Sequence, residues 1–161
     1  MSVRRIVSTR AATAPASARY AHAVEVNGVL HVTGQLPVDP GDPDAPLAEG
    51  IVAQAEMVFL NLAFIVEDAG YSLADTVFAR IYLADFDRDY VGFNSVFHRH
   101  FADPSGLPAR TTVGVARLGR GALVEVELTL SRGEKSLPWA ITRSLFYSLA
   151  GRLARWSLRA P

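Results

Sequence analysis

The dipeptide Asn27-Gly28 constrains the fold most, because it separates two short runs in which apolar and polar residues alternate. Both residues of a two-residue hairpin turn need a positive φ angle, which asparagine and glycine adopt most readily. The flanking runs have the period of two that is typical of strands. The sequence therefore predicts an antiparallel hairpin with strands over residues 20–26 and 29–35.

Residues 51–69 have a different period, since their apolar residues recur at spacings of three and four. This spacing forms one apolar stripe along a helix, and Gly70 suits the position that ends it. The remaining predicted elements, in chain order, are a strand over 76–83, a helix over 87–101, and strands near 111–117 and 122–131. Two helices can cover one face of such a sheet, so we expect an α+β fold with a mixed sheet and both helices on one face.

Composition narrows the classes of function. The 161 residues carry 16 basic and 16 acidic side chains, and a neutral total argues against nucleic acid as the main partner. Cysteine is absent, which fits a reducing, cytoplasmic location and leaves no thiolate metal site. The chain has neither a secretory signal pattern nor an apolar run long enough to span a membrane.

The charge is uneven along the chain, and we place a domain boundary near Gly133. Residues 133–161 hold five basic residues and one acidic residue, so residues 1–132 carry the opposite net charge. Apolar residues from Ile141 to Trp156 recur at helical spacing, although Gly151 weakens a helix there. This basic extension could be a helix docked on the body, a loose or marginal helix, or a contact with a membrane surface or partner.

Glu125 and Glu127 lie in a run in which valine and leucine alternate with glutamate. Side chains of a strand alternate between its faces, so the two carboxylates share the face opposite the apolar residues. That face is either an ordinary solvated surface or one buried against another subunit. In the second case a carboxylate on it would be perturbed and functional.

Arg110 follows Pro108 where a loop enters a strand. A guanidinium held there could bind a carboxylate through two parallel hydrogen bonds, and the alternative is a surface salt bridge. A turn centred on Arg120 would pair the last two strands as a hairpin and put Arg110 opposite residue 130. Arg110 and Glu125 would then meet only across a subunit interface, or within one chain if the turn has another register.

No metal site is expected. His22 and His31 could be diagonal neighbours on the first hairpin, but two histidines without a third ligand make a weak site. The sequence also contains no nucleophile motif and no glycine-rich phosphate loop, and Gly119-Arg120-Gly121 is more simply a turn.

Residues 1–131 resemble the Rid (YjgF-type) family through short motifs in a specific order. The motifs are Ala18-Arg19-Tyr20, Val32 to Pro37, Gln54-Ala55, Tyr82 to Phe86, Phe93-Asn94, Pro108 to Val113 and Ala122 to Glu127. The resemblance implies a chorismate-mutase-like fold and a homotrimer with active sites between subunits. It also implies hydrolysis of reactive 2-imino and enamine acids of the 2-aminoacrylate type to 2-keto acids and ammonia, without a metal or organic cofactor.

The resemblance also implies roles for individual residues. Arg110 matches the arginine that binds the substrate carboxylate, and Glu125 matches the carboxylate that holds the attacking water. The matches to the residues that line the substrate pocket are Tyr20, Gly34 and Asn94. The chain departs from the common pattern at Arg19, Thr33 and Thr111. These departures leave open an alternative, a non-catalytic small-carboxylate-binding or regulatory module of the same fold.

Overall fold

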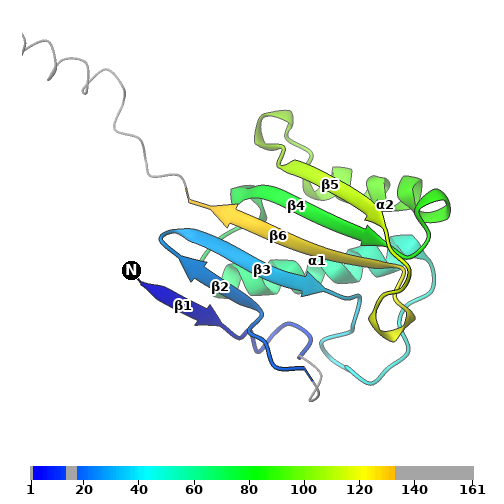
Figure 1. The fold of residues 1–161 in the computed structure, drawn as a ribbon, viewed down its shortest axis with the longest axis horizontal. Helices are drawn as coiled ribbons and strands as arrows, with labels where there is room; N and C mark the ends of the chain where they lie inside the picture. The colour runs from blue at the N-terminus through cyan, green and yellow to red at the C-terminus, as the bar shows by residue number, and fades with distance from the viewer. Residues whose placement is uncertain (1, 14–17, 133–161) are drawn as a thin grey trace, which may run out of the picture.

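The computed structural model of the protein describes residues 2–13 and 18–132, and the basic extension expected over 133–161 lies outside them. In the described part, one sheet of six strands carries two helices on a single face, as predicted (Figure 1). The strands are β1 (Val3–Ile6), β2 (Ala23–Val26), β3 (Val29–Gln35), β4 (Thr76–Leu83), β5 (Ala109–Gly114) and β6 (Val124–Ser131). Their order across the sheet is β1-β2-β3-β6-β4-β5.

The predicted hairpin is confirmed. Asn27 and Gly28 both have positive φ angles, and β2 pairs antiparallel with β3 around them. The strand β1 was not predicted; it is short, has two adjacent arginines and pairs with β2 at the edge of the sheet. Short, charged strands are typical of sheet edges, and they carry little of the apolar alternation by which a strand is recognised.

The two helices are α1 (Ile51–Asp68) and α2 (Phe86–His100), within a residue or two of the prediction. Gly70 has a φ angle of 83°, as a residue just past the end of a helix requires. At the start of α2, the side chain of Asp85 accepts a hydrogen bond from the backbone N–H of Arg88.

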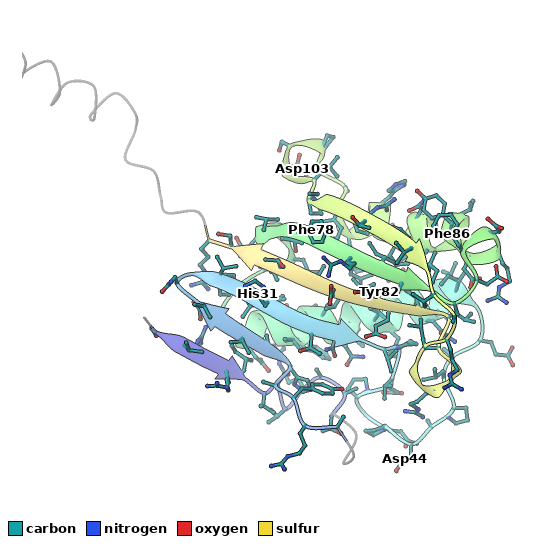
Figure 2. The ribbon with its side chains drawn as sticks, viewed as in Figure 1. His31, Asp44, Phe78, Tyr82, Phe86 and Asp103 are labelled. Atoms are coloured by element: carbon teal, nitrogen blue, oxygen red, sulfur yellow. The ribbon has the colours of Figure 1, made fainter. Side chains whose placement is uncertain are left out.

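The core lies between the sheet and the helices. The inward residues of β6 are almost completely buried, alternating with Glu125 and Glu127, so the predicted alternation is confirmed. Phe59 of α1 is fully buried and stacks with Phe93 of α2. The opposite face of the sheet has no helix on it in the described part, and Figure 2 shows Phe78, Tyr82 and His31 along this open face. Among the described residues, no helix is both long enough and apolar enough to cross a bilayer.

The predicted pairing of the last two strands is wrong. β5 pairs with β4, parallel to it, and β4 lies between β5 and β6. Arg110 is therefore level with Ala79 rather than opposite residue 130. The physical reason is α2, because a helix between two strands makes the long crossover connection that a parallel pair needs. The Gly119–Gly121 segment forms a single 3-10 turn that leads from β5 to β6 around the end of β4.

Candidate active site

A cleft of about 790 Å³ contains three of the residues singled out from the sequence, Tyr20, Gly34 and Glu125. Tyr20 precedes β2, Gly34 lies near the end of β3, and Glu125 lies near the start of β6. The register between β3 and β6 shifts between Val32 and Gln35, which is a bulge in the ladder. Bulges redirect side chains next to functional sites, and this one lies beside Glu125.

A glycine is needed at position 34 because the side chain of Glu125 lies close to its Cα atom, and not because of its backbone angles. A methyl group placed on Gly34 would overlap a carboxylate oxygen of Glu125 and lie 2.9 Å from its Cδ. Any larger residue would displace the carboxylate. Gly34 therefore makes the space in which the side chain of Glu125 lies.

The environment of Glu125 favours its protonated form. Burial raises the pKa of this carboxyl above its ordinary value, and the negative charge of Glu127 raises it further. Burial also raises the pKa of Tyr20, with a smaller contribution from Glu125. Glu127 itself accepts a hydrogen bond from Tyr82 and forms an ion pair with Arg80 on the open face. A carboxyl whose pKa is raised can exchange protons more readily near neutral pH.

A second group of residues surrounds Arg110 on β5. Arg110 Nη1 donates to Asn94 Oδ1 at 2.8 Å, and Arg110 Nη2 donates to the hydroxyl of Tyr90 at 3.2 Å. The guanidinium carbon also lies 4.7 Å from the centre of the Phe97 ring. Tyr90, Asn94 and Phe97 share one face of α2 because they are four and three residues apart. The helix therefore fixes the orientation of the guanidinium.

The fold of one chain separates these two groups. Arg110 is level with the buried residue Ala79, so its side chain is on the helix-covered face of the sheet. Glu125 is level with Tyr82, whose side chain is on the open face. The strand β4 also lies between them, since Arg110 is on β5 and Glu125 is on β6. Tyr20, Gly34 and Glu125 thus form a cleft group, and Asn94 and Arg110 form an edge group.

The structure adds two residues that sequence reasoning missed. Tyr90 contacts Arg110, and the helical spacing to Asn94 could have revealed it. Thr112 lies two residues beyond Arg110 on the same face of β5, and within the described chain its hydroxyl is buried without a hydrogen-bond partner. Period-two alternation could have indicated Thr112, whereas Thr111, the residue compared with the family pattern, points to the other face and is exposed.

The described residues contain no group of three or more histidine, cysteine, aspartate or glutamate side chains that could hold a metal ion. His22 is buried, and its ring accepts from the backbone N–H of Ser8 and contacts the carbonyl of Ala12. His31 is exposed on the open face. Neither histidine lines the cleft, which offers carboxylate and hydroxyl groups for proton transfer.

Residues 11–131 match the sequence profile of the family described as endoribonuclease L-PSP. The chain belongs to this family, the Rid (YjgF-type) family. A goat member named 2-iminobutanoate/2-iminopropanoate deaminase is 36% identical over 132 residues, which cover 81% of this chain and 92% of the relative. Other Rid relatives have only the generic name RutC family protein, and one from yeast is named as mitochondrial.

Solved Rid structures have the same fold. RidA from the Antarctic bacterium Psychrobacter sp. PAMC 21119 is 38% identical with a TM-score of 0.73, covering 80% of this chain and 99% of that one. TdcF of E. coli, solved with bound serine, is 27% identical with a TM-score of 0.73, covering 81% of this chain and 99% of that one. The family thus includes imine deaminases and a member solved with a small amino acid bound.

Proposed function

We propose that the protein hydrolyses small 2-imino and enamine acids of the 2-aminoacrylate type, releasing 2-keto acids and ammonia. The observation that carries the proposal is the half-buried carboxylate of Glu125, seated against Gly34 in a cleft, with a raised pKa. The related deaminase and the serine bound to TdcF support a small substrate with a carboxylate. Cytoplasmic location is part of the same proposal, supported by the absence of cysteine.

In the proposed mechanism, the guanidinium of Arg110 binds the substrate carboxylate through two parallel hydrogen bonds. The imine reacts as its N-protonated form. Glu125 accepts a proton from a water molecule while the water oxygen bonds to the carbon of the C=N group and the π electrons of that bond move to nitrogen, which gives a carbinolamine. The protonated Glu125 then donates its proton to the amino nitrogen, the C–N bond breaks and ammonia leaves, and the hydroxyl proton passes to solvent as the C=O bond forms. An enamine first takes up a proton at its terminal carbon to give the N-protonated imine. Orientation of substrate and water, together with proton transfer, is sufficient for catalysis, because the imine carbon is already electrophilic.

The same proposal includes a homotrimer in which each cleft is completed by a neighbouring subunit. Its support is the separation of the cleft group from the edge group within one chain, since Arg110 and Glu125 must come from different subunits to act together. Aromatic side chains on the open face also favour a covered surface, because exposed apolar sheet faces promote association. Light scattering on dilute protein is expected to give three chains per particle, and a stable monomer would contradict a shared site.

Cleavage of RNA, which the family description names, has less support in this chain. The cleft presents the carboxylates of Asp44 and Glu125, which repel phosphate groups. Its arginine, Arg120, already donates to two backbone carbonyls. A neutral chain with this lining suits a small substrate better than a polynucleotide.

The deciding experiment is ammonia release from 2-iminobutyrate or 2-iminopropionate, generated in place by an amino-acid oxidase or a threonine dehydratase. The wild-type protein is expected to accelerate release above the spontaneous rate, and Arg110→Ala is expected to abolish the acceleration. Arg117→Ala, which removes an exposed arginine beyond β5, is the matched control and should keep full activity. Binding of small carboxylates without acceleration would instead identify a non-catalytic binding module.

A further inference from the structure

Arg120 has a backbone conformation that an arginine rarely adopts. Its φ angle is 58° and its ψ angle 14°, in the left-handed region, and Gly119 and Gly121 flank it. Glycine adopts this conformation without steric cost, whereas any residue with a Cβ atom is strained there. A strained residue at a functional cleft suggests that its side chain has a purpose of its own.

The side chain of Arg120 reaches back along the chain to the loop that joins β3 to α1. Its Nη1 donates to the carbonyl of Pro43 at 2.5 Å, and its Nη2 donates to the carbonyl of Ala45 at 2.8 Å. Figure 1 shows the yellow turn before β6 beside the cyan loop, in agreement with these contacts. The planar guanidinium can hold two carbonyls at once, which a lysine cannot do in the same geometry.

The two ends of this loop are held by α1 instead. Asn61 Nδ2 donates to the carbonyl of Val38, and Gln54 Nε2 donates to the carbonyl of Ala48, each at 2.8 Å. Asn61 and Gln54 are both buried, so these two anchors are part of the core. Among the described residues, the hydrogen bonds from outside the loop to residues 42–46 come from Arg120.

The loop forms a wall of the cleft that contains Glu125. Leu36, Val38, Pro43 and Asp44 line the cleft on this side, and Figure 2 shows Asp44 at the outer tip of the loop. The apolar side chains on the wall suit an aliphatic substrate side chain that extends away from Glu125.

We propose that Arg120 is a specificity-determining positioning residue, which holds the β3–α1 loop so that the cleft binds imino acids with extended aliphatic side chains. The inference rests on the proposed deaminase function and names a substrate class for the same cleft. Arg120 acts through the loop, by fixing the position of Pro43 and Asp44, and does not need to touch the reacting atoms.

The test compares Arg120→Gly with wild type, with Arg117→Gly as the matched control. Glycine removes the two side-chain hydrogen bonds and also relieves the backbone strain, so the thermal midpoint should stay within a few degrees of wild type. Deuterium uptake of the peptide covering residues 42–48 should become faster in Arg120→Gly but not in the control. Arg120→Lys should show an intermediate uptake, because an ammonium group replaces the two-pronged donor.

Kinetics with two imines then test the substrate class. For the imine generated from leucine, Arg120→Gly should raise KM about tenfold with little change in kcat, as expected when uniform binding contacts are lost. For 2-iminopropionate, kcat/KM should stay within about twofold, because its methyl group does not reach the loop. Equal losses for both imines, or no change for either, would overturn the role in specificity.

The remaining outcomes separate this inference from the proposed function. Unchanged deuterium uptake in Arg120→Gly, with normal turnover of both imines, overturns the positioning role and leaves the deaminase function intact. A wild-type protein that turns over 2-iminopropionate but not the leucine imine overturns the substrate class alone. A wild-type protein that accelerates neither imine overturns the proposed function and the substrate class with it, while the uptake result still decides whether Arg120 holds the loop.

Discussion

The cleft group and the edge group of the candidate site are built in opposite ways. Glu125 lies in an open cleft lined by loops and by the end of β3, and its own position depends on the space left by Gly34. Arg110 lies on a strand, under a helix that contributes Asn94 and Tyr90 to hold it. The residue proposed to bind the substrate is therefore rigidly oriented, while the residue proposed to transfer protons lies where substrate and water can enter. Under the proposed function, each group is one half of a site that two subunits share.

The largest loss of activity is expected from replacing either Arg110 or Glu125. Arg110→Ala and Glu125→Gln should each lower kcat/KM about a hundredfold or more, since an oriented charged contact contributes on the order of 3 kcal/mol. Arg110→Lys should recover little activity, because a point charge cannot reproduce the two-pronged contact. Steady-state ammonia release measures the loss, and light scattering confirms that the variants keep the assembly of wild type.

Co-expression of these two inactive variants tests directly whether the halves belong to different subunits. Random mixing should restore about a quarter of the wild-type rate, because each interface then has one intact Arg110 and one intact Glu125 with that frequency. The mixed trimers can be isolated through a different affinity tag on each variant, and about a third of the wild-type rate is expected for them, because one interface of three is then intact. Mixed assemblies that remain inactive would contradict a site shared between subunits.

Gly34→Ala should have a smaller but clear effect on the cleft group alone. The added methyl group overlaps the carboxylate of Glu125, which must rotate away, so kcat should fall about tenfold. Gly28→Ala would be a poor control because Gly28 has a positive φ angle, whereas Gly106→Ala adds a methyl group into open space. Full activity in Gly34→Ala would show that the observed position of Glu125 is not needed for turnover.

The pH dependence of kcat/KM should depend on the charges around Glu125. Burial and the charge of Glu127 both raise the pKa of Glu125, so the ionised form that accepts a proton from water is lost at a higher pH than for an ordinary carboxyl. Glu127→Gln removes the repulsion, which lowers the pKa of Glu125 and moves the acid limb of kcat/KM to lower pH. Glu67→Gln, on α1 away from the cleft, should leave the limb in place. A shift to higher pH in Glu127→Gln would contradict this account.

The smallest change in activity is expected from deletion of the C-terminal extension. Deletion of residues 136–161 should change activity and assembly by no more than a factor of a few, because both groups of the site lie upstream of residue 133. Gel filtration and the ammonia assay check this together. Aggregation or loss of turnover would show that the proposed boundary near Gly133 is wrong and that the site depends on more than its two groups.

Much of the fold could be predicted because its signals are local. The Asn-Gly turn, the helical spacing over α1 and the alternation over β6 depend on neighbouring residues, and each is confirmed. The strand β1 could not be predicted in the same way. Its four residues are held in a strand by pairing with β2, and the side chain of Ile6 packs into the core.

The site was predicted as a set of residues, and the expected separation of Arg110 from Glu125 within one chain was derived from the wrong strand pairing. The order of motifs singled out Tyr20, Gly34, Asn94, Arg110 and Glu125, and the structure brings these together as two groups rather than one. Tyr90 and Thr112 were missed. Helical spacing from Asn94 places Tyr90 beside the guanidinium of Arg110, and strand alternation places Thr112 on the same face of β5 as Arg110. Their involvement depends on knowing that α2 packs over β5, which is a tertiary contact.

The hairpin, the two helices and the alternating strand follow from backbone preferences and from apolar periodicity within a short window, so the amino-acid sequence was enough to predict them. The position of β5 beyond β4 and parallel to it, which puts Arg110 and Glu125 on opposite faces, follows only from how the elements pack together. Turn residues such as Gly119 and Gly121 permit a hairpin but do not require one. The choice was made by non-local hydrogen bonding and by the burial of α2 against the sheet, neither of which can be read from neighbouring residues.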